Sequence, residues 1–247
     1  MDKALYIAMT GAKHNMLAQS VHANNLANAS TTGFKADFAQ ARSMGVYYGD
    51  GAPTRAYALT ENPGTDFSTG PMNATGRDLD VAIRGPGLFA VQAPDGTEAY
   101  TRSGNMTLGP NGELLTANGL PVMGDGGPIV IPPAEKIDIG LDGSITALGA
   151  GEGAATLIQV DRIRVVTADP QNLAKGSDGL IRSRDGEALE PAEDVQLAPG
   201  FLESSNVNAI NEFTEVLSLS RQYELQVKMM KTVEQNSEAS ARLLQTS

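Results

Sequence analysis

Asp78 and Asp80 come closest, by residue type and spacing, to residues that could do chemistry. They flank Leu79 at the two-residue period of a β-strand, which would place both side chains on one face. Two neighbouring carboxylates can act as the acid and the base or nucleophile of a glycosidase. Arg77 and Arg84 lie nearby, however, and alternating polar residues are common where an ordinary strand begins. The pair therefore supports a glycan hydrolase only as an alternative reading.

Residues 85–90, GPGLFA, match the glycine pattern of a dinucleotide-binding turn. That chemistry requires a helix directly after the glycines, because the first amides of the helix bind the pyrophosphate. The sequence continues instead as LFAVQAPDGT, which predicts a strand and a turn, and Pro86 removes an amide. We interpret the pattern as a turn between strands.

The two histidines and the absence of cysteine leave little basis for a metal or nucleophile site. His14 and His22 are eight residues apart, whereas two ligands on one helix need a spacing of about four, and no acid lies between them. Without cysteine there is no disulfide, thiol catalyst or thiolate ligand. We expect no catalytic, cofactor-binding or metal-binding residues, and we interpret both histidines as helix-packing residues.

The charge distribution excludes two classes of partner. The net charge is −11, and the excess of acids lies between residues 36 and 202, because the charges of the two terminal segments nearly cancel. An acidic surface repels phosphate backbones and anionic lipids, so nucleic acid and direct membrane insertion are not expected. No apolar stretch approaches about 20 residues. The first residues, MDKALYIAMTGAK, lack the apolar core of a Sec signal, so we expect export by another route.

Residues 1–35 predict a helix without a charged face. Lys13 is the only formal charge between Ala4 and Phe34. Surface helices normally carry charges opposite their apolar stripe, so this helix is expected to pack against several neighbours, with burial inside its own domain as the alternative. Steps of four and three residues give a heptad seam: Leu5, Met9, Ala12, Met16, Gln19, Ala23 and Leu26.

The stretch NLANASTTGFK, residues 25–35, predicts the end of that helix. Ser and Thr favour local hydrogen bonds over helix continuation, and Gly33 is suited to a left-handed C-terminal cap with an apolar contact from Phe34. The amides of Asn25 and Asn28 have no local explanation in the sequence.

Residues 203–247 predict a second terminal helix, which begins after an N-cap at Asn208 and continues to about Leu244. Two heptad helices that enclose a different middle predict a discontinuous coiled-coil domain in which the chain ends pair. The second seam comprises Phe213, Val216, Ser220, Tyr223, Val227, Met230, Glu234, Ser237, Ala241 and Leu244.

The middle of the chain predicts β structure, so the fold class is α+β with a central antiparallel domain over 76–202. Short apolar runs such as LFAVQ (88–92) alternate with Asx-Gly pairs that are typical of type I′ hairpin turns. Residues 36–75 contain many glycines and prolines and predict an extended connector with little core.

Three segments resemble the bacterial flagellar rod and hook family. The terminal motifs are ANNLANASTTGFK (23–35) and GFLESSNVNAINEFTEVLSLSRQYELQVKMMKTVEQN (200–236), and residues 77–124 are similar to the family's shared β domain. The opening ALYIAMTGAK and the run KADFAQARSM (35–44) are most similar to the proximal-rod member. The distal-rod member is the alternative within the family.

The resemblance implies a structural role and a location. Such proteins are exported unfolded by the flagellar type III apparatus and assemble with copies of themselves and with other rod proteins in the basal body. The terminal helices would form an inner coiled-coil layer, with the β domain outside. We expect amides such as Asn25, Asn28, Asn206 and Asn208 to pair across subunits, and the helices to order fully only on assembly.

Two other classes of function stay open from the residues alone. One is the glycan hydrolase that uses Asp78 and Asp80. The other is a regulatory module whose helices dock on a single partner, although a docking helix rarely lacks a face for solvent.

Overall fold

The computed structural model describes residues 3–46, 55–61, 64–149, 157–192 and 195–245. The chain forms two compact units, each assembled from separate segments. The helical unit comprises Met1–Ala29, Asp37–Gly64 and Val207–Ser247, and the β unit comprises Ser30–Ala36 and Thr65–Asn206. The fold is therefore α+β, as predicted.

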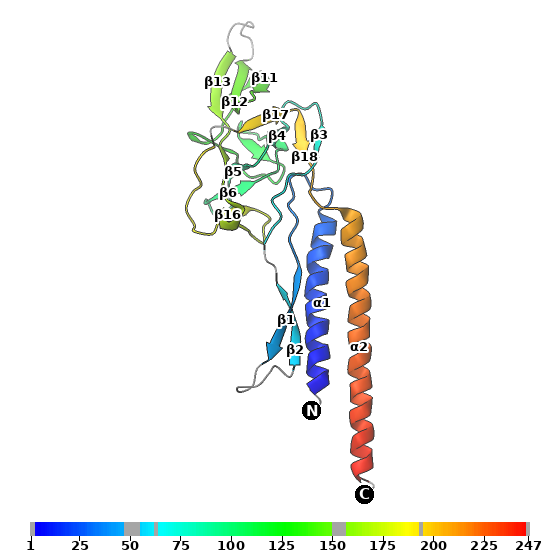
Figure 1. Ribbon diagram of the computed structural model, residues 1–247. Coiled ribbons are helices and arrows are strands. Elements are labelled where there is room, and N and C mark those ends of the chain that lie inside the picture. Colours follow the sequence, from blue (N-terminus) through cyan, green and yellow to red (C-terminus); the bar gives the residue numbers. More distant parts are fainter. Residues whose placement is uncertain (1–2, 47–54, 62–63, 150–156, 193–194, 246–247) are drawn as a thin grey trace. The chain divides into compact units, whose positions relative to one another are not determined.

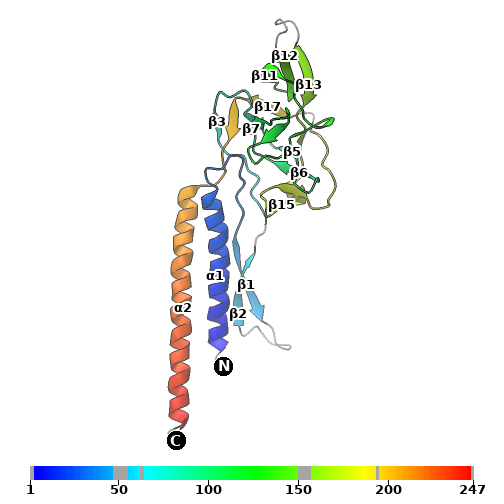
Figure 2. The same ribbon diagram turned by 180° about the vertical axis from the view of Figure 1, so that it is seen from behind.

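The helical unit is built on the two chain ends. Helix α1 (Lys3–Ala27) and helix α2 (Ala209–Gln245) run antiparallel side by side, and α2 continues past the amino end of α1 (Figures 1 and 2). Strands β1 (Gln40–Val46) and β2 (Arg55–Glu61) pair as an antiparallel ladder that lies along α1, opposite α2.

This ladder corrects the prediction of an extended connector over 36–75. Glycines and prolines cluster there, but residues 40–46 and 55–61 pair over seven positions, from Gln40 with Glu61 to Val46 with Arg55. An isolated two-stranded ladder is marginal in water. Here β2 gains the flank of α1, where His14 Nδ1 accepts a hydrogen bond from the Thr60 amide at 2.9 Å. Contact with α1 therefore stabilises two strands in a segment whose glycine and proline content predicts none.

The helix boundaries are set by side-chain caps. Asn208 Oδ1 accepts from the amides of Ile210 at 3.1 Å and Asn211 at 3.3 Å, which confirms the predicted N-cap of α2. Helix α1 ends at Ala27, inside the stretch 25–35 that was predicted to end it but ahead of TTGF, and residues 28–30 form a turn. Gly33 does adopt a left-handed φ of 67°, but six residues beyond the helix.

The β unit contains one five-stranded sheet in the order β14-β5-β6-β16-β15, in which all strand pairs are antiparallel. Its fourth and fifth strands are short, and the 3-10 helix η1 (Pro170–Asn172) precedes the last strand in the order. The strands are β5 (Leu88–Gln92), β6 (Glu98–Thr101), β14 (Val165–Val166), β15 (Leu173–Lys175) and β16 (Ile181–Ser183).

Smaller antiparallel ladders complete the unit. A three-stranded sheet joins β11 (Ala134–Ile139), β12 (Ser144–Gly149) and β13 (Leu157–Arg162). Four pairs, β3–β18, β4–β17, β7–β8 and β9–β10, account for the remaining described strands. Their bounds are β3 (Met72–Ala74), β4 (Val81–Arg84), β7 (Met106–Leu108), β8 (Leu114–Thr116), β9 (Met123–Gly124), β10 (Gly127–Pro128), β17 (Gln196–Pro199) and β18 (Phe201–Glu203).

The hairpin turns differ from the predicted type. A type I′ turn needs positive φ at two central residues. Among described residues, positive φ occurs only at glycines. At Asp95-Gly96, Gly96 has φ 83°, the Ala93 amide bonds to Thr97 O at 2.9 Å, and the Gly96 amide bonds to Ala93 O at 2.9 Å. This is a three-residue loop with a left-handed glycine, so the Asx-Gly pairs located the turns but not their class.

Large apolar side chains fill the interior of the β unit. The main cluster includes Val81, Phe89, Met106, Leu114 and Ile145, all 0% exposed. A second cluster under the five-stranded sheet contains Tyr100 and Val166. In the part of the chain that the structure describes, neither helix is long and apolar enough to cross a membrane.

Candidate assembly surface on the terminal helices

The face of α1 that is buried within the chain carries small residues. Ala8, Gly11, Ala18 and Asn25 are buried and recur at steps of three and seven residues. A Cβ added at Gly11 would lie 3.0 Å from the Gln226 side-chain nitrogen on α2. Small side chains allow the two helix axes to approach closely.

The opposite face of α1 carries the large apolar side chains, and it is exposed. Tyr6 is 44% exposed, Met9 52%, Met16 63% and Leu17 46%, and Lys13 is exposed among them. Helix α2 has a similar set: Ile210, Phe213, Leu217, Tyr223, Leu225, Val227 and Met229, which are between 39% and 75% exposed. We call these two sets of side chains the apolar helix surface.

The predicted seams therefore do not describe the contact between α1 and α2. In the α1 seam, Met9, Met16 and Ala23 are exposed, Leu5 and Leu26 are half-buried, and only Ala12 is buried. In the α2 seam, Val216, Ser220 and Met230 are half-buried, whereas Phe213, Tyr223 and Val227 are exposed. The most apolar heptad positions face away from the chain's own helix pair. Their role in assembly stays a prediction.

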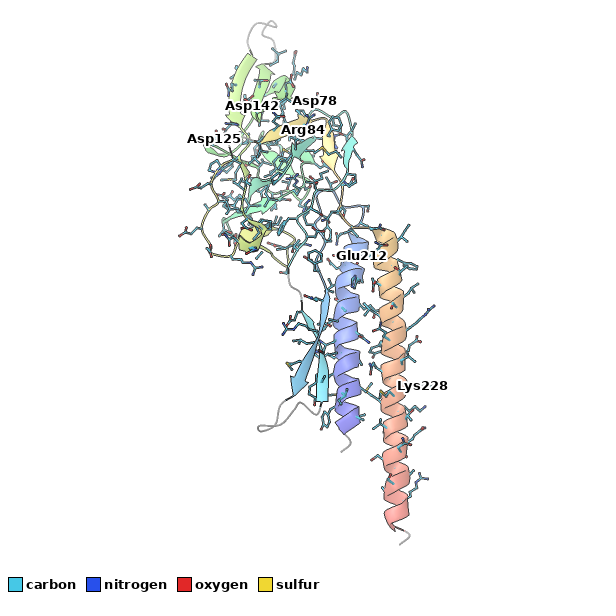
Figure 3. The ribbon with its side chains drawn as sticks, viewed as in Figure 1. Asp78, Arg84, Asp125, Asp142, Glu212 and Lys228 are labelled. Atoms are coloured by element: carbon cyan, nitrogen blue, oxygen red, sulfur yellow. The ribbon has the colours of Figure 1, made fainter. Side chains whose placement is uncertain are left out.

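A polar junction ties the end of α1 to the start of α2. His22 Nδ1 lies 2.6 Å from Glu212 Oε2, and Asn25 Nδ2 reaches the same oxygen at 3.5 Å. Figure 3 shows Glu212 at the first turns of α2, beside the carboxyl end of α1. The interpretation of His22 as a helix-packing residue is confirmed by this contact, and that of His14 by its bond to Thr60.

Asn25 also holds the chain that leaves the helix. Its Nδ2 donates to Asp37 O at 2.9 Å, and its Oδ1 accepts from the Asp37 amide at 3.0 Å. The side chain thus pairs with both backbone groups of one residue, as a neighbouring strand would. Asn25 is 1% exposed, so these bonds satisfy a buried amide.

The other asparagine amides of the two motifs are likewise used within the chain. Asn28 Nδ2 bonds to Asn24 O at 2.9 Å, and Asn208 caps α2. Asn206 Oδ1 accepts from the Ala36 amide at 2.8 Å, and its Nδ2 donates to Asp66 O at 2.8 Å. The expectation that these amides pair across subunits therefore needs correction, because local backbone groups already bind them.

The end of the N-terminal motif is anchored in the β unit. The Gly33 amide donates to Glu203 O at 2.8 Å, and a Cβ at Gly33 would lie 2.4 Å from the backbone of Arg102 and Ser103. The Phe34 ring lies under the Lys175 ammonium, 3.8 Å from its centroid. Gly33 and Phe34 thus serve chain packing rather than the helix cap that we predicted.

A buried ion cluster follows directly in the sequence. Glu203 Oε1 lies 2.7 Å from Lys35 Nζ, and Glu203 Oε2 lies 2.6 Å from Arg102 Nε. The three side chains are 1–3% exposed. Arg102 also donates to the carbonyls of Gly87, Ile83 and Gly85, so it closes the GPG turn.

Burial and pairing act in opposite directions on these charges. Burial alone would raise the pKa of Glu203, but the hydrogen bond from Lys35 and the positive charge of Arg102 outweigh it and lower the pKa. For Lys35, burial outweighs the attraction of Glu203 and lowers the pKa of the ammonium. The local sequence pattern does not predict this cluster. The clue available was a charged residue in each motif: Lys35 at the end of the N-terminal motif, after TTGF, and Glu203 near the start of the C-terminal motif, after GFL.

The residues first considered for catalysis do not form a site. Asp78 and Asp80 lie ahead of β4. Asp78 is exposed (Figure 3), whereas Asp80 is buried, so the two carboxylates do not meet the same surroundings. Asp80 Oδ1 lies 3.8 Å from Arg77 Nη1. Within the described ranges no three His, Asp or Glu residues group as metal ligands would.

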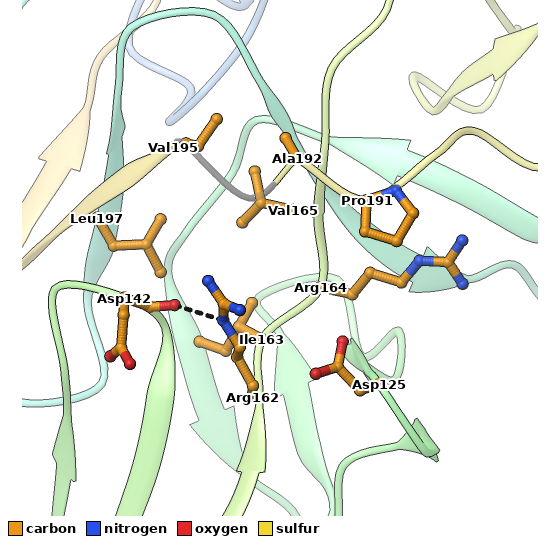
Figure 4. Close-up of a pocket in the computed structure, with 10 residues that line it drawn as sticks. All are labelled: Asp125, Asp142, Arg162, Ile163, Arg164, Val165, Pro191, Ala192, Val195 and Leu197. Carbon is orange, nitrogen blue, oxygen red and sulfur yellow. Dashed lines mark hydrogen bonds between the residues drawn. The ribbon is translucent and has the colours of Figure 1, made fainter.

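A pocket of about 220 Å³ in the β unit is also unlike a catalytic centre. It is lined by Arg162, Arg164, Asp125 and Asp142 together with apolar side chains (Figure 4). Arg162 Nε donates to the Asp142 carbonyl at 2.7 Å, and the Asp142 carboxylate points away and binds Ser144. The pocket holds two arginines and two carboxylates, and Arg162 and Asp142 are engaged in local structure.

Comparisons with known proteins give consistent matches. Three families match: Flagellar basal body rod FlgEFG protein C-terminal over residues 198–243, Flagellar hook protein FlgE/F/G D1 domain over 82–147, and Flagella basal body rod protein over 5–35. The chain is 38% identical to Flagellar basal-body rod protein FlgF of Escherichia coli (strain K12) over 100% of both chains.

Other relatives extend the range of the similarity. FlgF of Caulobacter vibrioides is 38% identical over 98% of each chain. Flagellar basal-body rod protein FlgG of Bacillus subtilis (strain 168) is 33% identical over 94% of this chain and 95% of the relative. The matches cover both terminal motifs and the β unit between them.

Proposed function

The chain belongs to the flagellar basal-body rod protein family and is a structural subunit of the basal-body rod, and we propose that it polymerises in the proximal rod through α1 and α2. The observation that carries the proposal is the apolar helix surface, whose large side chains the chain itself leaves exposed. Relatives named FlgF reach 38% identity, and a relative named FlgG reaches 33%. We take FlgF as the proximal-rod member and FlgG as the distal-rod member, so the identities favour the proximal rod.

The energetics of the helix surface favour contact with other chains. Full burial of a large apolar side chain contributes about 1.5–3 kcal/mol. So many exposed large apolar side chains along two helices favour an interaction site. A repeated contact that does not close on itself produces a helical tube, with α1 and α2 in a coiled-coil inner layer.

We propose altered roles for the other residues that the sequence pointed to, and for the segment that contains β1 and β2. Met9, Met16, Ala23, Phe213, Tyr223 and Val227 are proposed to contact neighbouring subunits. Asn25, Asn206 and Asn208 are proposed to hold each subunit's own segments in place for that contact. The ladder of β1 and β2 belongs with the helices as part of the assembling domain.

We also propose that the helices order fully only on assembly. Beyond Val233, the α2 side chains described, residues 234–242, are all exposed. Helices without tertiary packing are marginal in water. Far-ultraviolet circular dichroism of the dilute monomer should show less helix than α1 and α2 together contain. Full helix content would refute this part.

Location and export complete the proposal. The subunit is proposed to leave the cytoplasm through the flagellar type III apparatus as an extended chain and to assemble in the periplasmic part of the basal body. The absence of cysteine fits an unfolded passage without disulfides to break. We propose no catalytic role, since Asp78 and Asp80 do not converge.

A substitution at Met16 tests assembly through the helix surface. Met16→Lys should abolish motility and rod completion, because a charge would be buried between subunits. The purified monomer should keep its folding stability, because the Met16 side chain is 63% exposed. Met16→Leu, which keeps an apolar side chain, is the matched control and should be motile.

Ala12 is unsuitable for this test, although it lies in the predicted seam. It is 6% exposed within the chain, so a lysine there would disrupt the monomer itself. Normal flagella in cells that carry Met16→Lys together with Met9→Lys would contradict assembly through α1.

A further inference from the structure

The two Asn-Gly pairs of the β unit, Asn111-Gly112 and Asn118-Gly119, have a chemistry that their role in turns does not use. Asparagine is chemically labile, and most so before glycine, because glycine has no side chain to hinder attack by its own backbone nitrogen. The glycine nitrogen attacks the side-chain carbonyl carbon of the asparagine. A bond forms between these two atoms, and the bond from that carbon to the side-chain nitrogen breaks. The proton of the glycine amide goes to the leaving nitrogen, which departs as ammonia and leaves a succinimide ring.

Water then opens the succinimide ring. Addition of water at one carbonyl gives aspartate, and addition at the other gives isoaspartate, in which the main chain runs through the former side chain. Either product adds one negative charge, and isoaspartate also lengthens the main chain by one methylene group. Water is the only co-reactant, so the surroundings of each asparagine decide its rate.

The two pairs lie in turns of the same class. In each turn the glycine amide bonds to the carbonyl three residues earlier, Gly112 to Gly109 O at 3.0 Å and Gly119 to Thr116 O at 2.8 Å. A second bond, from the amide of the first residue to the carbonyl of the fifth, measures 2.8 Å in both turns. Both glycines are left-handed, with φ of 83° at Gly112 and 76° at Gly119. A difference in reactivity must therefore come from what surrounds the turns.

The turn at Asn111 is fixed to a neighbouring segment. The Gly112 carbonyl accepts a hydrogen bond from the Ile131 amide at 2.7 Å, and a Cβ added at Gly112 would collide with Ile131 O. Ile131 is 2% exposed and belongs to the main apolar cluster. For the ring to form at Asn111, the turn must separate from Ile131 as well as give up its own bonds.

The turn at Asn118 is open. Asn118 and Gly119 are both exposed, and within the described chain a Cβ added at Gly119 would meet no atom within 4 Å beyond its chain neighbours. In such turns the amide two residues after an Asn or Asp often holds the side chain. Here that amide, from Leu120, bonds to Thr116 Oγ1 at 3.1 Å instead. The ring therefore has room to form once the turn's own bonds open.

We propose that Asn118 is a site of spontaneous deamidation in the folded chain and that the contact with Ile131 protects Asn111. One more hydrogen bond must open at Asn111 than at Asn118, which corresponds to a rate difference of about fivefold. The product accumulates with the age of the protein and adds negative charge to the exposed turn after β8. The site does not depend on the helix surface, so a motile Met16→Lys strain would leave it standing.

Incubation of the purified full chain at mildly alkaline pH, below its unfolding temperature, tests the proposal. Tandem mass spectrometry of its peptides measures the conversion of amide to acid at each asparagine. The rates at Asn118 and Asn111 should be nearly equal in denaturant, where neither turn exists. The ratio of the Asn118 rate to the Asn111 rate should be at least about fivefold higher in the folded chain.

Matched substitutions check that the product is assigned to the correct residue. Asn118→Gln should remove most of the ammonia that the folded chain releases from the two pairs, because glutamine would have to form a larger and less favourable ring. Asn111→Gln should leave that release nearly unchanged, and circular dichroism checks that both variants fold. Equal rate ratios in the folded and denatured chains would overturn the proposal. So would a faster reaction at Asn111, or no product at Asn118 in the folded chain over a time in which the denatured chain reacts.

Discussion

In the β unit the least exposed side chains are large, including Tyr100, Phe89 and Met106, whereas in the helical unit they are small, including Ala8 and Ala18. The large apolar side chains of the helical unit are on its outside. The difference shows two stages of burial. The β unit buries its large apolar side chains within one chain, whereas the helical unit packs its helix pair with small and polar residues and leaves its large apolar side chains exposed.

The ion pairs of the two units differ in their exposure to solvent. Glu203 and its two cations are almost fully buried, so their bonds form without competition from water. The His22–Glu212 pair of the helical unit is about 18% exposed on both sides, and the Arg42–Glu61 pair on β1 and β2 is open to solvent. We therefore expect polar substitutions to affect stability far more in the β unit.

The largest effect is expected for Glu203→Gln. Removal of the carboxylate charge leaves two buried cations without a counterion, which typically costs about 3–5 kcal/mol of folding free energy. Chemical denaturation of the full chain measures the loss. Glu61→Gln, the same substitution in the exposed pair with Arg42, is the control and should cost at most about 1 kcal/mol. Equal effects of the two would remove the contrast between the units.

The same carboxylate predicts how the stability of the β unit depends on pH. The pKa of Glu203 in the folded chain lies below its ordinary value of 4.5. Its contribution is therefore fully present above pH 4.5 and is lost as the pH falls through the lowered folded pKa. Acid unfolding followed between about pH 6 and pH 2 should be less steep in Glu203→Gln than in the parent chain. An unchanged slope would show that other carboxylates dominate.

An intermediate effect is expected for Asn25→Ala in the helical unit. The substitution leaves the two backbone groups of Asp37 without the side chain that binds them, at a cost of about 1–3 kcal/mol. Asn24→Ala, at an exposed neighbouring position, is the control and should change stability by less than about 0.5 kcal/mol. Hydrogen exchange of the Asp37 amide should report the loss directly, and unaltered protection would contradict the role assigned to Asn25.

The sequence predicted the parts of the fold that depend on local rules. The N-cap at Asn208, the strand LFAVQ and the positions of the hairpin turns need only neighbouring residues, and all are confirmed. The ladder of β1 and β2 was missed because its strands rely on the flank of α1.

The candidate site was harder to predict, because heptad spacing does not say which stripe faces the chain's own partner. Both the Met9–Met16 stripe and the Ala8–Ala18 stripe have helical spacing. Hydrophobicity favours the Met9–Met16 stripe as the contact, whereas the fold buries the Ala8–Ala18 stripe, since small side chains let α2 approach. Lys35 and Glu203 were missed because a contact across 168 residues leaves no local pattern.

Leu225→Lys is expected to have the smallest effect on monomer stability, although it should block rod assembly completely. Leu225 is 65% exposed on α2, so Leu225→Lys should change the folding free energy of the monomer by less than about 0.5 kcal/mol. The same substitution should prevent rod completion, because the lysine would have to be desolvated between subunits. Leu225→Met is the apolar control.

This prediction separates the two units most directly, because the same assays on Glu203→Gln should give a large loss of monomer stability. Negative-stain microscopy of purified basal bodies reports rod completion, and chemical denaturation reports the monomer. If Leu225→Lys destabilised the monomer by several kcal/mol, α2 would be part of a core within the single chain. The exposed leucine would then no longer mark an interface, and the contrast between a finished β unit and an unfinished helical unit would have to be given up.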